Sequence, residues 1–106
     1  MRLVIVESPY AGDVVANIMY ARRCVKDSLQ RGEAPIASHL LYTQPGILND
    51  DVPEERKWGI AAGLEWGEVA DAHVFYVDRG WSKGMKEAFE RCTIIGRTYD
   101  IRRIDK

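Results

Sequence analysis

The sequence predicts a single α/β domain built on a parallel sheet of about four strands. Short apolar or β-branched runs alternate along the chain with longer stretches whose apolar residues recur at helical spacing. A length of 106 residues with 46% apolar content suits one domain with a modest core. Strands and helices that alternate in this way form parallel sheets with right-handed crossovers, and the helices cover both faces.

The first strand is predicted at residues 3–7, a β-branched run that ends before Ser8 and Pro9. A helix follows, with Asp13 as its N-cap and Gly32 as its stop. The apolar residues of this helix that recur at helical spacing are Val14, Ile18, Ala21, Val25 and Leu29.

Residues 34–42 contain the second strand, which is predicted at 35–38. We then expect a helix from 53 to about 69, a strand at 73–77, a helix between Ser82 and Gly96, and a strand at 98–104. Ser82 is suited to cap the last helix, and Pro53 to begin the middle one. We expect the strand order 2-1-3-4, a short flavodoxin-like (Rossmann-like) three-layer sandwich. Ligands of such folds bind outside the carboxyl ends of the strands.

Composition excludes several classes of protein. Fifteen lysines and arginines balance sixteen aspartates and glutamates, which argues against binding extended nucleic acid or an acidic membrane. No stretch approaches the roughly 20 apolar residues of a membrane span, and Glu7 interrupts the N-terminal apolar run, so we expect a cytoplasmic protein. Cys24 and Cys92 lack metal-site spacing and are expected to be reduced packing residues. We expect no metal and no cofactor.

Two glycine-bearing turns, residues 8–12 and 78–84, each lie between a predicted strand and a predicted helix. Gly12 and Gly80 are the positions that best suit unusual backbone angles or close approach of a ligand. Each could equally make only a tight turn. Neither turn has the dinucleotide-binding or phosphate-loop pattern, which argues against enzymes of those classes.

Side chains in these turns suit a nucleotide. Tyr10 and Trp81 are placed to stack on a base or ribose, although they could instead cover the edges of the core. Arg79 and Lys83 could neutralise a phosphate or remain solvated. His39 follows the second strand and could face the crevice, or act as a hydrogen-bonded structural residue.

The middle helix carries Gly59 and Gly63 one turn apart, and each costs about 1 kcal/mol relative to alanine. Close packing on the sheet or on the same helix of a second subunit would offset that cost. Trp58 and Trp66 extend the surface, so a homo-oligomer is expected, with simple helix-on-sheet packing as the alternative.

The chain resembles the nucleoside 2-deoxyribosyltransferase superfamily, which includes the deoxynucleoside 5′-monophosphate N-glycosidases. The resemblance spans most of the chain and rests on residues 8–12, Asn17, Tyr20, 71–77 and 82–85. Residues 38–44, with Glu55 and Arg56 before the two helical glycines, look more specifically like small uncharacterised domains common in phages and bacteria.

This resemblance implies a flavodoxin-like fold, an oligomer that completes each site, no metal, and a glutamate nucleophile that attacks the anomeric carbon of a deoxyribose. The N-glycosidases carry a pattern similar to Ser-x-Gly-x-x-x-Glu. Ser82 and Gly84 match it, but the sixth residue is Ala88 and the nearest carboxylate, Glu87, comes one position early. One residue turns a helix by about 100°, so Glu87 is expected to project away from the apolar stripe.

Two main functions therefore remain open, beside a purely structural or protein-interaction role. The first is binding of a small nucleotide-derived ligand, with sequestration of a nucleotide signal as its purpose. The second is an N-glycosidase or deoxyribosyltransferase that uses Glu87, Asp78 or Glu7. The ligand-binding candidates are Ser8, Tyr10, Gly12, Asn17, His39, Asp78, Gly80, Trp81, Ser82 and Gly84.

Overall fold

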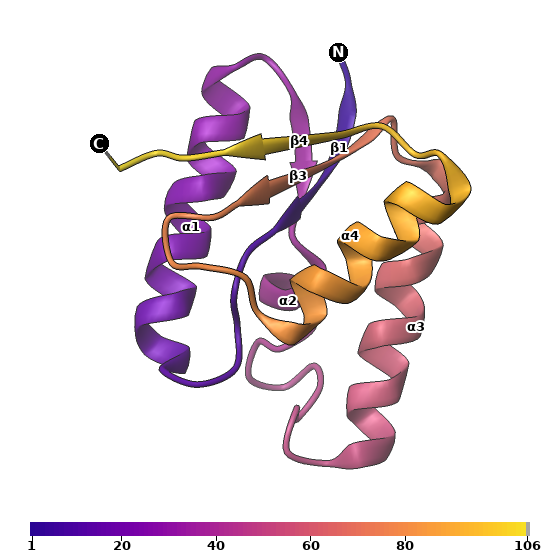
Figure 1. Ribbon diagram of the computed structural model, residues 1–106. Helices are drawn as coiled ribbons and strands as arrows, with labels where there is room; N and C mark the ends of the chain where they lie inside the picture. Colours follow the sequence, from indigo (N-terminus) through magenta and orange to yellow (C-terminus); the bar gives the residue numbers. More distant parts are fainter. Residues whose placement is uncertain (106) are drawn as a thin grey trace.

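The computed structural model describes residues 1–105 and contains one four-stranded parallel sheet (Figure 1). The strand order is β2-β1-β3-β4, which confirms the predicted class and order. In chain order, the elements are β1 (Leu3–Glu7), α1 (Val14–Gln30), β2 (Ala34–Ile36), α2 (Ser38–Leu41), α3 (Pro53–Val69), β3 (Ala72–Tyr76), α4 (Lys83–Ile95) and β4 (Tyr99–Arg102).

Two buried apolar clusters, one on each face of the sheet, hold the three layers together. Residues of β1 and β3 that face α1 form the larger cluster, which includes Val4, Val74 and the helical Cys24. Phe75 and Val77 point to the other face, where they pack against Met85 and Cys92 of α4. Figure 1 shows α1 on one side of the sheet, with α4 and α3 on the other. Both cysteines are free and buried, as expected for packing residues.

The helix ends follow the predicted local chemistry. The Asp13 side chain accepts a hydrogen bond from Ala16 N, and Ser82 Oγ accepts one from Met85 N, both at 3.2 Å. Gly96 ends α4 with a φ of 74°, a left-handed conformation that favours glycine.

The second and fourth strands are shorter than predicted. Residues 38–41 form the helix α2 instead of continuing β2, since Leu40 N and Leu41 N both donate to the carbonyl of Ala37. The last strand ends at Arg102, because the backbone N–H groups of Ile104 and Asp105 turn away to bond the Asp78 carboxylate.

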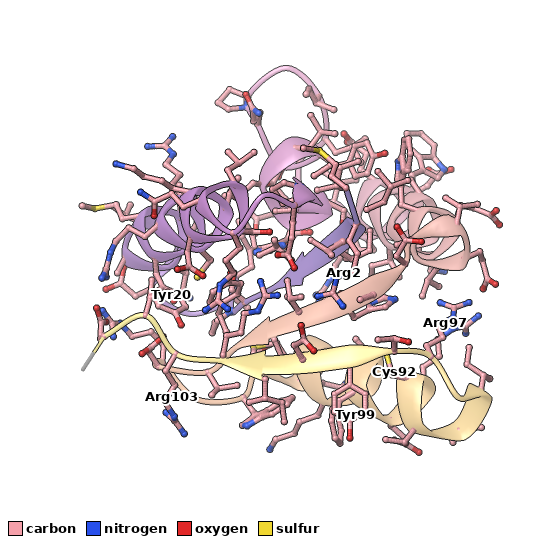
Figure 2. All side chains as sticks on the ribbon, turned by 90° about the horizontal axis from the view of Figure 1, so that it is seen from above. Arg2, Tyr20, Cys92, Arg97, Tyr99 and Arg103 are labelled. Atoms are coloured by element: carbon pink, nitrogen blue, oxygen red, sulfur yellow. The ribbon has the colours of Figure 1, made fainter. Side chains whose placement is uncertain are left out.

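A buried ion pair ties the beginning of β2 to the end of β4 on the α1 side of the sheet. Arg102 Nη1 and Nη2 donate to the two carboxylate oxygens of Glu33 at 2.7 and 2.8 Å. Ser28 and Arg2, the latter labelled in Figure 2, also donate to Glu33. The bonds from Arg102, ahead of those from Arg2 and Ser28, lower the pKa of Glu33 to about 2.

The helix α3 is the most exposed long element. Of its 17 residues only Gly67 is buried, while Trp58, Ile60, Leu64 and Trp66 are all exposed. Among the helices in residues 1–105, none combines the length and apolar character needed to cross a membrane.

Candidate functional site

A cavity of about 810 Å³ lies between α3 and α4, on the sheet face opposite α1. Its floor includes Glu7 and Ser8, at the carboxyl end of β1, and His73 of β3. One wall is α3 and the facing wall is α4, with α2 and the following turn between them. Below, we call this space the α3–α4 cavity.

Three glycines one turn apart on α3 line this cavity and also contact the rest of the chain closely. A Cβ on Gly63 would lie 2.8 Å from Ser38 Oγ, and one on Gly59 would lie 3.3 Å from Leu48 Cδ1. A Cβ on Gly67 would lie 3.2 Å from Cε1 of His73. Close packing within the chain, on α2, the loop after it and His73, therefore accounts for these glycines without a second subunit.

Ser8 and His39 form a hydrogen-bonded pair at the cavity wall. Ser8 Oγ and His39 Nε2 are 2.7 Å apart, and both residues line the α3–α4 cavity. Burial lowers the pKa of His39 to about 4, so the imidazole is neutral at pH 7. The pair thus places two polar, uncharged groups beside the space.

One end of the cavity gathers groups from β1, β3 and α4. Glu7 Oε1 lies 3.4 Å from Nδ1 of His73. Nε2 of His73 is the one buried side-chain nitrogen or oxygen without a partner in residues 1–105. Burial raises the pKa of the nearby Cys92 thiol, which therefore stays protonated. Figure 2 shows Cys92 and Arg97 at the same end of the molecule, and both line the cavity.

The first turns of α4 reach the cavity with Ser82, Lys83 and Gly84. Ala88 also lines the cavity, so the position at which the resemblance implies a glutamate does face this space and carries only a methyl group. Glu87 is exposed, yet it belongs to the same lining. Consecutive residues differ by about 100° around a helix, so Glu87 is turned away from the direction of Ala88. Its carboxylate nevertheless still lies at the edge of the cavity.

Asp78 lies outside the α3–α4 cavity, and its carboxylate is engaged elsewhere. It accepts a hydrogen bond from Tyr20 Oη at 2.6 Å and others from the backbone of Ile104 and Asp105. Burial opposes ionisation, but these bonds outweigh it and the pKa of Asp78 is lowered. The carboxylate therefore holds α1 and the C-terminal segment together.

Trp81 and Gly80 also lie outside the α3–α4 cavity. The indole of Trp81 packs against Phe75 and Phe89, with ring centroids 5.4 and 5.2 Å away. Gly80 has a φ of 83° with open space around it, which matches a tight turn. The Arg79 guanidinium pairs with Asp105 at 2.8 Å. Most of this second turn therefore serves packing, and only its end reaches the cavity.

The first turn is divided in the same way. Tyr10 lines the α3–α4 cavity, whereas Gly12, with a φ of 100°, borders a neighbouring hollow. Asn17 Nδ2 donates to the carbonyls of Tyr10 and Ala11, each at 3.0 Å. Asn17 thus holds the turn in place instead of facing the cavity.

Comparison with protein families gives one match, to a domain of unknown function (DUF7768), across residues 2–102. The chain belongs to this family. No curated protein sequence matches it. Among solved structures, a 2-deoxyribosyltransferase from Bacillus psychrosaccharolyticus is similar with a TM-score of 0.65. That match has 15% identity and covers 95% of this chain and 72% of the other.

At this level of identity, the match to the 2-deoxyribosyltransferase shows a shared fold alone. It confirms the fold that the resemblance implied. The cavity also contains residues that the sequence did not single out, above all His73, Arg97 and Gly67. Alternation along the third strand places His73 on one face, but its close approach to Gly67 of α3, beside Arg97, depends on the tertiary fold.

Proposed function

We propose that the protein binds a small nucleotide-derived ligand in the α3–α4 cavity. The cavity itself is the observation that carries this proposal. It lies at the end of β1, where the strand order of a 2-1-3-4 sheet reverses and where such folds bind ligands. Its volume of about 810 Å³ is within the range of small-molecule sites.

The dimensions and chemistry of the walls support a mononucleotide. Along α4 the lining extends from Ser82 to Cys92, ten residues or about 15 Å of helix. Backbone N–H groups at the start of α4 suit a phosphate, and Lys83 adds a positive charge there. The neutral Ser8–His39 pair suits hydroxyl or base groups farther in. In this proposal the ligand is bound without turnover, as sequestration of a nucleotide signal requires.

Thermal shift and isothermal titration with nucleosides and their 5′-monophosphates test the proposal. We expect Lys83→Ala to weaken binding of a monophosphate about 3- to 10-fold and to leave nucleoside binding unchanged, since a partly exposed charge is worth about 1 kcal/mol. Lys86→Ala is the matched control, because Lys86 is exposed on the same helix and does not line the cavity. No binding of any nucleoside or nucleotide by the wild-type protein would refute the proposal.

A second candidate is an N-glycosidase or deoxyribosyltransferase. Its support is that Glu7 and Glu87 are among the four acidic residues that line the cavity, the others being Asp50 and Glu55. Incubation with deoxynucleotides followed by chromatography distinguishes the two functions. Intact ligand recovered after heat denaturation supports binding alone. Free base that is made by wild type and by Glu90→Gln, but lost in Glu87→Gln or Glu7→Gln, establishes catalysis. Glu90 is exposed on α4 and outside the lining.

We also propose that the protein forms a homo-oligomer through α3. The support is the exposure of Trp58, Ile60 and Leu64 on a helix that buries only Gly67. Its glycines face the chain itself, so these apolar side chains, not the glycines, are what a second copy would cover.

A further inference from the structure

The floor of the α3–α4 cavity carries a carboxylate that has one hydrogen-bonding partner among residues 1–105. Glu7 is the last residue of β1, and its side chain is 21% exposed. Within residues 1–105, its one side-chain contact within hydrogen-bonding range is the 3.4 Å approach to His73 Nδ1. A carboxylate can accept about four hydrogen bonds. Most of this capacity therefore remains for a ligand.

The His73 side chain makes one polar contact within residues 1–105. A carboxylate oxygen only accepts, so Nδ1 carries the hydrogen that points towards Glu7. Within residues 1–105, Nε2 is buried without a partner, which is unfavourable for a polar atom. An apolar side chain would avoid that cost. The contact with Glu7 is therefore what an imidazole supplies at this position, and His73 acts as a positioning residue.

The cations at this end of the cavity bind other groups. Arg97 Nη2 is 2.5 Å and Arg91 Nη2 is 2.9 Å from carboxylate oxygens of Glu68. Neither arginine comes within 4 Å of Glu7 among the described residues. Within residues 1–105, no arginine or lysine pairs with the Glu7 carboxylate, so it repels a phosphate and attracts groups that donate hydrogen bonds.

We propose that Glu7 binds a pair of adjacent hydrogen-bond donors on the ligand. This inference rests on the proposed nucleotide binding. Two such pairs occur in nucleotides: the 2′,3′-diol of a ribose, and the N1–H and N2–H groups of guanine. An acidic residue in a doubly wound fold binds a ribose in the first way. The phosphate then lies towards Lys83, at the opposite end of the cavity.

Titration calorimetry with GMP, dGMP, UMP and dUMP tests the inference and distinguishes the two sources. If the diol is bound, GMP and UMP bind about 10- to 100-fold more tightly than their deoxy forms, the range expected for hydrogen bonds to a charged group. If the guanine edge is bound, GMP and dGMP bind alike and both exceed UMP and dUMP by the same factor. In either case Glu7→Gln removes the preference, and Glu90→Gln retains it.

The positioning role of His73 is tested by comparing a substitution that keeps an N–H donor with one that removes it. Asparagine offers an amide N–H near the position of Nδ1, so His73→Asn retains part of the preference, while His73→Phe loses it. A purely structural role for His73 would change all four affinities together.

The failures of the two proposals are distinguishable. If nucleotides bind but the four ligands have equal affinity, or if Glu7→Gln leaves their ratios unchanged, this inference is overturned and the proposed function stands. If none of the four binds, this inference is overturned, and the proposed function falls with it when no other nucleoside or 5′-monophosphate binds.

Discussion

Glu33→Gln should remove a large part of the stability of this domain at neutral pH. The Glu33 side chain is 9% exposed and its partner Arg102 is 6% exposed. The bonds from Arg102, with those from Arg2 and Ser28, lower the pKa of Glu33 from 4.5 to about 2. At about 1.4 kcal/mol per pKa unit, this shift corresponds to about 3 kcal/mol of folding free energy.

The pH dependence follows from the sign of this shift. A carboxylate with a depressed pKa in the folded state stabilises the protein fully above its unfolded pKa of 4.5. That stabilisation is lost as the pH falls from 4.5 towards 2. Glutamine resembles the protonated acid, so the difference in unfolding free energy between wild type and Glu33→Gln should be about 3 kcal/mol at pH 7. It should approach zero near pH 2.

Urea unfolding of both proteins at pH 7, 4.5, 3 and 2 measures this difference directly. The comparison isolates Glu33 and the arginines that it shares with Asp100, because carboxylates outside this network titrate equally in both proteins. Glu90→Gln, at an exposed site on α4, is the control. A difference below 1 kcal/mol at pH 7, or one that does not change with pH, would refute the reasoning. So would an Arg102→Met variant as stable as wild type, since it leaves a buried carboxylate without its main partner.

Three further predictions concern packing around the site and assembly. Gly63→Ala should destabilise the protein by about 1 to 2 kcal/mol in chemical denaturation, because the new Cβ would lie 2.8 Å from Ser38 Oγ. In a Ser38→Ala background, which removes that oxygen, the same substitution should be neutral or stabilising. Asp78→Ala should cost about 2 to 4 kcal/mol in thermal or urea unfolding, because Tyr20 and the C-terminal backbone lose their acceptor, while the affinity for nucleotide stays the same. Sedimentation velocity should show an oligomer that Leu64→Ser converts to monomer, and a monomeric wild-type protein would contradict the proposed interface on α3.

The parts of the fold that could be predicted from the sequence depend on local chemistry. Asp13 and Ser82 cap their helices as their side chains dictate, and Gly96 ends α4 because it adopts a left-handed conformation. Strand order followed from the alternation of elements and the handedness of the crossovers. Residues 38–41 were predicted less well, since a short apolar run fits a strand or a single helical turn.

Most of the candidate residues that the sequence could indicate lie near the ends of strands and the starts of helices. Ser8, Tyr10, His39, Ser82 and Gly84 do meet around one cavity.

Long-range packing explains why other residues of the turns lie elsewhere. The polar sequence neighbours of Trp81 favour a ligand crevice, but Phe89, eight residues later on α4, places its indole in an aromatic cluster. Asp78 finds its partners on α1 and in the C-terminal segment. Neither contact has a sequence signature.

The most direct test of the central claim is an amide chemical-shift titration with GMP and UMP by two-dimensional NMR. Binding in the α3–α4 cavity predicts saturable shifts at Ser8, Gly63 and Gly84, with Gly80 and Trp81 unchanged, because only the first three line the cavity. Shifts confined to Gly80 and Trp81, or no shift at millimolar nucleotide, would contradict the account.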